Sequence, residues 1–297
     1  MDTFDFVVVG GGSGGCTVAG RLSEDPQTSV ALLDAGGKND NWVVTTPFAL
    51  ALMVTGTINN WAFNTVPQAG LNGRVGYQPR GKGLGGSSAI NAMVYIRGHR
   101  SDYDQWADLG NPGWSFADVL PYFKRSEDNA DFDGEYHGKG GPLAVNRLRT
   151  GNPVHQIFLQ AAQEAQFRLR EDFNAEDHEG LGVYQVTQKN GERWSAARAY
   201  IHPHMNSRAN LRVEVRAQAL FGLSQHPAVA LGQVPLILVI TSPAGRSIQT
   251  TRDLPGFWAG SWRDVAKEMR GRYPKHSWPD DPAAAAPTLR TKRASQA

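Results

Sequence analysis

The sequence contains only one cysteine in 297 residues, Cys16, so an internal disulfide is excluded. A lone cysteine is compatible with a reducing cytoplasm. No apolar run reaches the ~18 residues that a membrane span needs, and the acidic start MDTFDFVVVG is unlike a secretory signal. The formal net charge of +2 is too small to indicate nucleic acid or an anionic membrane as a partner. We therefore expect a cytoplasmic protein without a membrane span.

Glycine, in contrast, is abundant and clustered. The segment GKGLGGSSAIN (81–91) holds four glycines and two serines, which is too little side-chain volume for a core. The sequence FDFVVVGGGSGGCTVAGRLSEDPQTSVALLDAGG (4–37) predicts a strand, a glycine turn, a helix and a second strand. Phe6 to Val9 form the continuous apolar run expected of a central parallel strand covered on both faces, and Val30 to Leu33 form the second strand.

Gly10, Gly12 and Gly15 form a G-x-G-x-x-G motif directly after the first strand. The first glycine permits a tight turn, the second lets a pyrophosphate approach the backbone, and the third lets helix and strand pack closely. The helix beginning near Ser13 offers its amino end to phosphates. Asp34 ends the second strand, where a carboxylate can bind ribose hydroxyls. The order of these features predicts a site for an adenine dinucleotide.

The ligand could be NAD or FAD, and the long irregular stretch 39–78 favours FAD over the short, regular units of a NAD enzyme. Ser87, Ser88 and Asn91 could donate to its phosphates and ribityl hydroxyls. Further along, Ser115 is expected to cap a helix that Pro121 breaks or kinks, and a second helix is expected over Pro153 to Phe167. A strand is expected over Asn210 to Val215. After Ala217 the character changes toward a short charged helix and an Ala/Pro-rich basic end, which we expect to be disordered.

The motifs resemble the glucose–methanol–choline (GMC) family of flavin oxidoreductases. The segment GKGLGGSSAINAMVYIRGHRSDYD (81–104) resembles the first signature of that family, and NWAFNTVPQ, DQWADLGNPGWSFADVLPYF and QVTQKNGERWSAARAYIHP agree with it. The resemblance spans roughly residues 2–216 and is greatest to choline and other alcohol dehydrogenases. It implies an α/β fold with an FAD-binding, Rossmann-like doubly wound sheet, truncated here, and the start of a substrate domain. It also implies oxidation of a primary alcohol by hydride transfer to flavin N5.

The resemblance implies which residues contact FAD. Ile90 occupies the position of a histidine that carries covalent FAD in some relatives, so the resemblance implies non-covalent FAD here. The residues implied at the pyrophosphate are Gly10, Gly12, Ser13, Gly14 and Gly15. Asp34 and Ala35 are implied at the adenosine side, and Arg80, Gly81, Gly85, Gly86, Ser87, Ser88, Asn91 and Met93 are implied at the flavin and its linker.

The histidine base that the family supplies near its C-terminus, and its second signature, are not found, so no catalytic residue is assigned. From about residue 221 the sequence instead resembles the C-terminus of bacterial DEAH-box ATP-dependent helicases, without a P-loop, so no ATPase activity is expected. We therefore expect 1–150 to be the first part of an FAD-binding domain and 151–205 the start of a substrate domain. Residues 206–217 would return a strand to the FAD domain, and 218–297 would form an unrelated tail.

The first functional hypothesis is an FAD-dependent oxidoreductase acting on a small-molecule primary alcohol, with impaired turnover. The alternative is a non-catalytic FAD- or adenine-nucleotide-binding remnant of a gene fusion or frameshift; an RNA-binding fragment ranks below both. The alcohol and the electron acceptor are not identified. His202 and His204 are interpreted as loop residues without a metal, and His99 and Cys16 as structural. The tail tryptophans Trp258, Trp262 and Trp278 are interpreted as packing residues, not base-stacking platforms.

Overall fold

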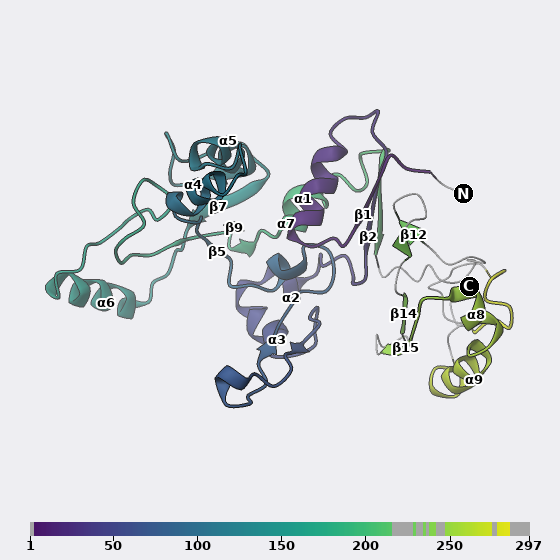
Figure 1. Ribbon diagram of the computed structural model, residues 1–297. Coiled ribbons are helices and arrows are strands. Elements are labelled where there is room, and N and C mark those ends of the chain that lie inside the picture. Colours follow the sequence, from purple (N-terminus) through teal and green to yellow (C-terminus); the bar gives the residue numbers. More distant parts are fainter. Residues whose placement is uncertain are drawn as a thin grey trace. The chain divides into compact units, whose positions relative to one another are not determined.

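The computed structural model describes residues 3–215, 228–229, 234–235, 238–241, 247–274 and 278–285. The chain divides into two compact units, Met1–Ala217 and Gln218–Ala297. The basic end that the sequence predicts to be disordered falls largely outside the described residues. Figure 1 shows the elements of both units.

A parallel sheet of three strands lies towards one end of the first unit (Figure 1). Its order is β1 (Phe6–Val9), β2 (Val30–Asp34) and β11 (Leu211–Val215), so β2 is the middle strand. Phe6 and Leu211 both lie opposite Val30. β11 confirms the strand expected over Asn210 to Val215, and it brings the chain back to the sheet after all the intervening elements.

The position expected for the first strand is wrong for the described part of the chain. β1 is an edge strand there, because its pairing partner is β2 alone. Phe6, Val7 and Val9 are 47%, 54% and 66% exposed. Their apolar run indicates a strand built to be covered on both faces, whereas only β2, with Val30 and Leu32 fully buried, has that environment here.

Two helices pack with this sheet and with each other. α1 (Ser13–Leu22) contacts β1 and β2, and α7 (Ala196–Tyr200) lies against α1. The contact is close because Gly20 has no side chain: a Cβ there would lie 2.7 Å from the Tyr200 carbonyl oxygen. The core of this region is formed by buried small and aliphatic side chains, which include Cys16, Ala19, Leu32, Ala197 and Ile201.

A second, mixed sheet lies in the same unit, with strand order β5-β8-β7-β6. β6 and β7 are parallel, and the other pairs are antiparallel. Its strands are β5 (Val94–Tyr95), β6 (Glu127–Asn129), β7 (Leu143–Arg147) and β8 (Gln185–Val186). Two short hairpins accompany it, β3 (Phe63–Asn64) with β4 (Tyr77–Gln78) and β9 (Gln188–Lys189) with β10 (Glu192–Arg193).

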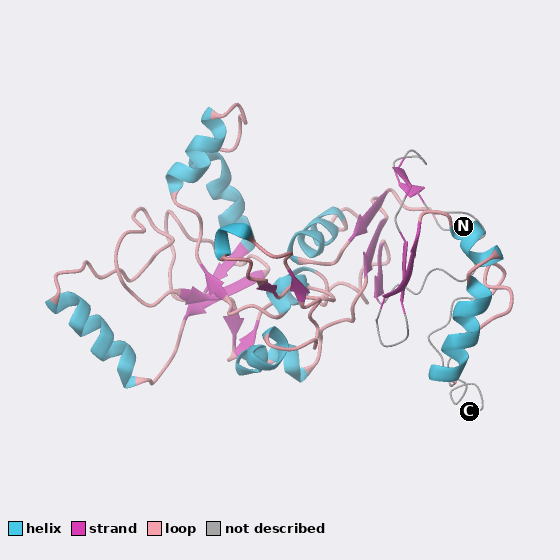
Figure 2. Cartoon of the chain, turned by 60° about the horizontal axis from the view of Figure 1, so that its bottom comes forward, coloured by secondary structure: helices cyan, strands magenta, loops and turns pink. Residues whose placement is uncertain are grey.

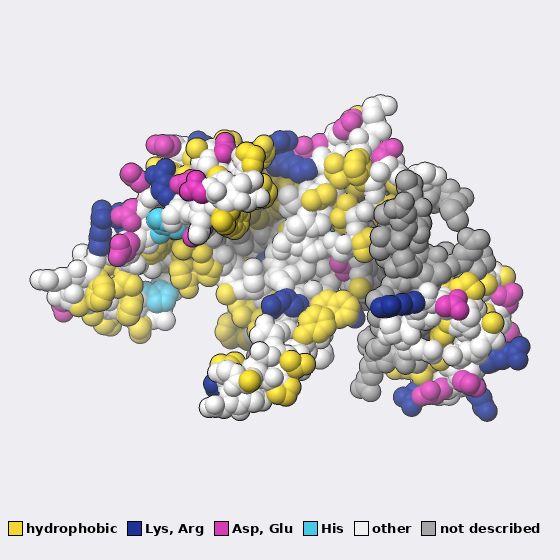
Figure 3. Space-filling view, in the orientation of Figure 1, with side chains coloured by type: hydrophobic (Ala, Val, Ile, Leu, Met, Phe, Trp, Pro, Cys, Tyr) yellow, Lys and Arg dark blue, Asp and Glu magenta, His cyan; other side chains and the backbone are white. Residues whose placement is uncertain are grey.

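The remaining helices of the first unit are mostly short and are connected by long loops (Figure 2). They are α2 (Trp42–Thr45), η1 (Pro47–Ala49), α3 (Leu50–Val54), η2 (Ala69–Leu71), η3 (Gly86–Ala89), α4 (Arg100–Asp108), α5 (Phe116–Ser126) and α6 (Pro153–Glu164). Ser115 caps α5 in a capping box with Asp118, as expected, but the helix runs through Pro121 without a break. α6 begins at Pro153, as expected, and exposes Ile157 and Phe158 within the apolar surface visible over it in Figure 3.

The second unit has a small core of its own. Its described elements are β12 (Ala228–Val229), β13 (Val234–Pro235), β14 (Leu238–Thr241), β15 (Ser247–Thr251), α8 (Leu254–Ala259) and α9 (Trp262–Arg272). Trp262 is buried with Leu254 and Phe257, and Trp258 and Trp278 pack against them. The packing interpretation of the three tryptophans is therefore confirmed. None of the helices within the described ranges is both long and apolar enough to span a bilayer.

A network of buried charged side chains surrounds Glu127 of β6, at the edge of the mixed sheet. The Glu127 carboxylate is fully buried and accepts a hydrogen bond from Arg97 Nη2 at 2.9 Å. His137 lies between two carboxylates: Nδ1 is 3.1 Å from Glu127 Oε1, and Nε2 is 2.7 Å from Asp172 Oδ2. Asn129 Nδ2 also lies 3.1 Å from Nδ1, but the two carboxylates favour a proton on both imidazole nitrogens. His137 is therefore an imidazolium in a buried network of alternating charge.

Burial by itself lowers the pKa of His137, but the hydrogen bonds to Asp172 and Glu127 outweigh it and raise the pKa from 6.5 to about 9. A histidine whose pKa is higher in the folded state stabilises the fold fully below its unfolded pKa. That stabilisation is lost as the pH rises through the folded value. The contribution of this network to the free energy of unfolding should therefore decrease in mildly alkaline solution.

We predict that the free energy of unfolding of the first unit decreases by roughly 3 kcal/mol between about pH 6.5 and about pH 10 because of His137. Denaturant unfolding followed by circular dichroism measures this decrease. His137→Gln should be less stable near neutral pH, and its deficit should shrink as the pH rises. His202→Gln, which changes a half-buried histidine outside this network, should keep the wild-type pH dependence. An imidazole NMR titration of His137 with a midpoint near 6.5 would contradict the prediction.

Candidate cofactor site

The first glycine segment, residues 10–15, turns the chain from β1 into α1. Gly10 has a φ of 98°, which favours glycine, and its amide donates to the Leu33 carbonyl at 2.8 Å. Gly12 is the N-cap of α1, and no side chain caps the helix. A Cβ added at Gly12 or Gly14 would meet nothing within 4 Å. The amino end of α1 is therefore open for an anion to approach its backbone.

Gly15 is needed for a different reason, which concerns packing within the turn. A Cβ at this position would lie 1.8 Å from the Gly10 carbonyl oxygen. Any side chain would thus force the first turn of α1 away from the end of β1. Of the three motif glycines, Gly12 leaves space for a ligand, and Gly15 lets the first turn of α1 pack against the end of β1.

The carboxylate of Asp34 fixes the backbone on both sides of it. Oδ2 accepts from the Gly11 amide at 2.8 Å, and Oδ1 accepts from the Gly36 amide at 2.7 Å. Asp34 is half-buried at the end of β2, and Ala35 beside it is exposed. Because a carboxylate can accept about four hydrogen bonds, capacity remains for a ligand hydroxyl.

The second glycine segment, residues 81–88, lies directly against the first. The Gly85 amide donates to the Gly11 carbonyl at 2.7 Å. A Cβ on Gly86 would lie 2.7 Å from Gly12 Cα, and one on Gly11 would lie 2.7 Å from Leu84 Cδ2. The sequence predicts that one ligand connects these segments; the structure shows that they also touch each other.

The two serines of the second segment are engaged differently. The Ser88 hydroxyl donates to the Gly85 carbonyl at 2.6 Å and accepts from the Ala196 amide at 2.9 Å. It therefore connects this segment to α7 and has no proton left for a phosphate. Ser87 is exposed and accepts from the Gly81 amide at 3.1 Å, so its own proton remains available.

The remaining expected residues flank these contacts. Arg80 is exposed, and its guanidinium donates to the carbonyl of Pro79, its own neighbour, at 2.7 Å. Asn91 is exposed, and its side-chain oxygen accepts from the amide of buried Met93 at 3.0 Å. Ile90 is 2% exposed and packs with Val44, Met53 and Ala89. The contacts described here bring residues 10–15, 34 and 81–88 together, whereas Arg80 points its charge at its own loop.

One buried residue at this site received no role from the sequence. Arg193, in β10, donates through Nη1 to the carbonyl oxygen of Asn91 at 2.6 Å and to Ser88 O at 3.3 Å. Its neighbour Ser195 caps α7. The available sequence signal was an arginine two residues before SAARAY (195–200), but its acceptors lie more than 100 residues away in the sequence.

The interpretation of Cys16 and His99 as structural residues is confirmed. Cys16 is fully buried, its thiol donates to Gly11 O at 3.1 Å, and burial raises its pKa to about 12. The thiol is thus protonated and inert. His99 is the N-cap of α4 and takes part in a capping box with Asp102. Within the described residues there is no group of three or more potential metal ligands.

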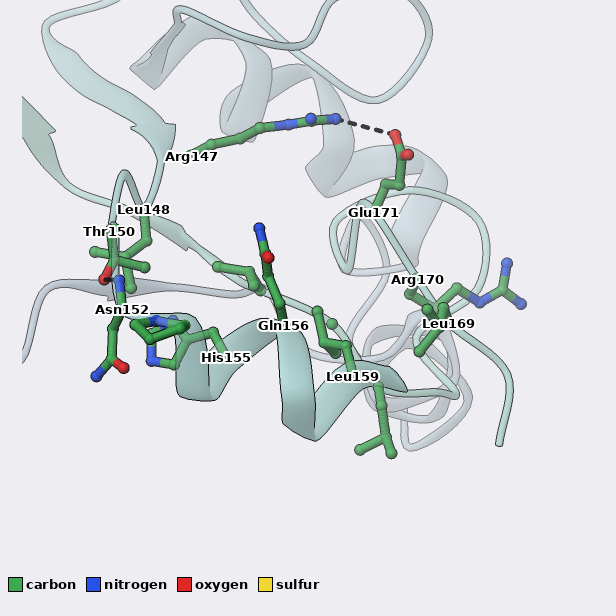
Figure 4. A pocket seen from close by; sticks show the side chains of 15 residues that line it. Arg147, Leu148, Thr150, Asn152, His155, Gln156, Leu159, Leu169, Arg170 and Glu171 are labelled. Atoms are coloured by element: carbon green, nitrogen blue, oxygen red, sulfur yellow. Dashed lines mark hydrogen bonds and ion pairs between the residues drawn. The ribbon is translucent and has the colours of Figure 1, made fainter. Parts of the chain in front are cut away.

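A cavity of about 520 Å³ lies elsewhere in the first unit, above α6 (Figure 4). Arg147 and Glu171 form an ion pair of 3.1 Å at its border, and Gln156 and Leu159 of α6 face it. None of its lining residues belongs to either glycine segment. The cavity is therefore separate from the site built by those segments.

The strand–turn–helix unit, the acid at the end of β2 and the parallel sheet define an α/β protein of the dinucleotide-binding type. Residues 4–231 match the family described as GMC oxidoreductase, which is most of the chain. The chain belongs to the GMC oxidoreductases. Residues 184–282 also match a family described as ATP-dependent helicase C-terminal. Both resemblances that the motifs indicated are therefore confirmed.

Relatives and solved structures agree with this assignment. The chain is 47% identical to "Alcohol dehydrogenase [acceptor]" of Pseudomonas putida, over 73% of its length and 39% of the relative. It is 46% identical to mitochondrial choline dehydrogenase of Homo sapiens, over 72% of its length and 37% of the relative. Pyridoxine 4-oxidase from Mesorbium loti has a similar structure, with a TM-score of 0.70 and 30% identity, over 84% of this chain and 47% of that one.

An FAD-dependent oxidoreductase from Chaetomium thermophilum is similar as well, with a TM-score of 0.65 and 31% identity, over 71% of this chain and 38% of that one. The fold class expected from the sequence is thus confirmed. The chain spans well under half the length of the curated relatives that it matches.

We predict effects of very different size on stability for two glycines of the motif. Gly15→Ala should lower the free energy of unfolding by more than about 2 kcal/mol, because its Cβ collides with backbone. Gly12→Ala should change it by less than about 0.5 kcal/mol, because its Cβ enters open space at a φ of −72° that alanine accepts. Thermal unfolding followed by circular dichroism separates the two, and equal losses of stability would refute the geometry.

Proposed function

We propose that this chain binds FAD non-covalently along both glycine segments and belongs by descent to the alcohol-oxidising flavoenzymes, with impaired turnover. The single observation that carries the proposal is the open backbone at Gly12 and Gly14 beside an uncapped helix end. Such a helix end presents unpaired amides and a positive dipole end to a pyrophosphate. The family and the FAD-dependent structural neighbour support the choice of FAD.

Asp34 is proposed to accept hydrogen bonds from the adenosine ribose. Its two oxygens already hold the Gly11 and Gly36 amides, so the carboxylate is fixed before a ligand arrives. A preorganised acceptor loses little conformational entropy on binding. Ala35, exposed at the same strand end, is proposed to lie at the adenosine side.

The flavin half is proposed to extend along the second glycine segment toward Met93. Gly81, Gly85 and Gly86 pack closely against other parts of the chain, where a Cβ would lie within 3.3 Å of another atom, and Ser87 keeps a free hydroxyl proton. Arg80, Ser88 and Asn91 complete the proposed border, with Ser88 acting through the backbone that it holds. Ile90 has no nucleophilic atom and is buried among apolar side chains, which supports a non-covalent cofactor.

Bound flavin would supply the acceptor for a hydride from the alcohol carbon. The protein must then take the hydroxyl proton, and a histidine is the usual base. Among the histidines in the described ranges, none is hydrogen-bonded to either glycine segment; His202, for example, bonds the Lys38 carbonyl. We therefore propose FAD binding with weak oxidation of a primary alcohol, by a chain that spans under half of its relatives.

The second candidate is a remnant that binds FAD without any turnover. It is favoured by the same observation, that no histidine of the described ranges is hydrogen-bonded to either glycine segment. The two candidates separate by what an alcohol does to the bound flavin. Slow anaerobic bleaching by choline or an aromatic alcohol supports the enzyme, whereas bleaching by dithionite alone supports the remnant.

We predict that the purified chain takes up FAD, shows a flavin spectrum, and releases FAD when ADP is added in excess. Gly12→Ala should weaken FAD binding at least about tenfold while the fold persists, because a methyl group fills the space proposed for the pyrophosphate. Fluorescence titration gives both dissociation constants.

Gly70→Ala is the matched control for this titration, because its Cβ also enters open space but lies outside both glycine segments. It should bind FAD as the wild type does. Unchanged FAD binding by Gly12→Ala, or no binding by the wild type, would contradict the proposed site.

A further inference from the structure

Arg193 joins three separate parts of the first unit. Its side chain is buried, with 1% of the residue exposed. Nε donates to the Val44 carbonyl of α2 at 3.0 Å. Nη1 donates to the carbonyl oxygen of Asn91 at 2.6 Å, to its side-chain oxygen at 3.0 Å, and to Ser88 O at 3.3 Å. One guanidinium therefore fixes the chain on both sides of Ile90.

Burying the charge of this arginine costs free energy, because little compensates it. No carboxylate pairs with it in the part of the chain that the structure describes, and its Nη2 finds no hydrogen-bond partner there. Burial lowers the pKa of Arg193 to about 10. Because a buried cation without a counter-charge costs more than an apolar side chain of similar size, its benefit must lie in the geometry that it imposes.

The geometry concerned is the backbone of Met93. This residue is buried yet has a φ of 62°, in the left-handed region that side chains other than glycine rarely adopt. Its amide donates to Asn91 Oδ1 at 3.0 Å, and its carbonyl accepts from the Thr187 amide at 2.8 Å. Asn91 Oδ1 is the same atom that Arg193 holds. Unfavourable backbone of this kind persists where the surroundings determine it, commonly at functional sites.

We infer that Arg193 is a positioning residue for the flavin half of the cofactor: it holds Asn91, which in turn holds Met93 in its left-handed conformation. This inference rests on the proposed function, because Asn91 and Met93 are the proposed flavin border. The hydrogen bonds of Arg193 go to Val44, Ser88 and Asn91, and none goes to the first glycine segment. Its role should therefore concern the flavin half and not the adenine half.

The test compares FAD with ADP, which has only the adenine half, on the full chain. Arg193→Met should weaken FAD about tenfold, because the flavin border is no longer preorganised, and leave ADP within about twofold. The visible circular dichroism of bound flavin should also change. A merely structural role would weaken both ligands by the same factor.

Asn91→Ala is the second variant, because its exposed side chain can be removed without opening the core. It should show the same selective loss of FAD, and combining it with Arg193→Met should add little. Arg198→Met is the matched control: it removes a neighbouring arginine, paired with Glu192, and should change neither ligand.

Each outcome decides the inference. Wild-type FAD binding by both variants, or equal losses for FAD and ADP, would overturn the positioning role while leaving the proposed function intact. A wild-type chain that binds ADP but not FAD, or neither, would overturn the proposed function and this inference together.

Discussion

Direct contact between two glycine backbones is the constraint on which the rest of the site depends. The Gly85 amide reaches the Gly11 carbonyl at 2.7 Å, and Gly86 and Gly12 approach so closely that a single methyl group would separate them. The approach depends on Gly86, whose Cβ would collide with Gly12 Cα, whereas a Cβ on Gly12 would enter open space. The contact fixes the second glycine segment beside the amino end of α1, so one elongated ligand can touch both.

The local part of this arrangement was readable from the sequence. The motif of Gly10, Gly12 and Gly15 and the acid Asp34 lie within one βαβ unit, where spacing along the chain determines geometry. The contact between the glycine segments was not readable, because the spacing of residues far apart in the chain carries no distance. Arg193 was missed for the same reason: its acceptors are carbonyl groups, which every residue has, so no residue type identifies them.

The error over β1 has a related cause. The apolar run Phe6 to Val9 is typical of a strand that is covered on both faces. In the described residues, β2 lies on one side of β1, and the chain spans under half the length of its relatives. Composition therefore predicted the strand and its direction correctly but not its neighbours. Apolar exposure on β1 and on α6 gives the first unit surfaces of the kind that usually contact other protein.

The first unit buries positive charge in two ways, and the contrast explains what each does. Arg97 and His137 face Glu127 and Asp172, so that network is nearly neutral and binds three loop residues to one another and to Glu127 of β6. Arg193 faces only carbonyl dipoles within the described residues, so its charge is not cancelled. Arg193 therefore acts through the backbone that it fixes, from Val44 to Ser88 and Asn91, whereas the paired charges of the other network act through their mutual attraction.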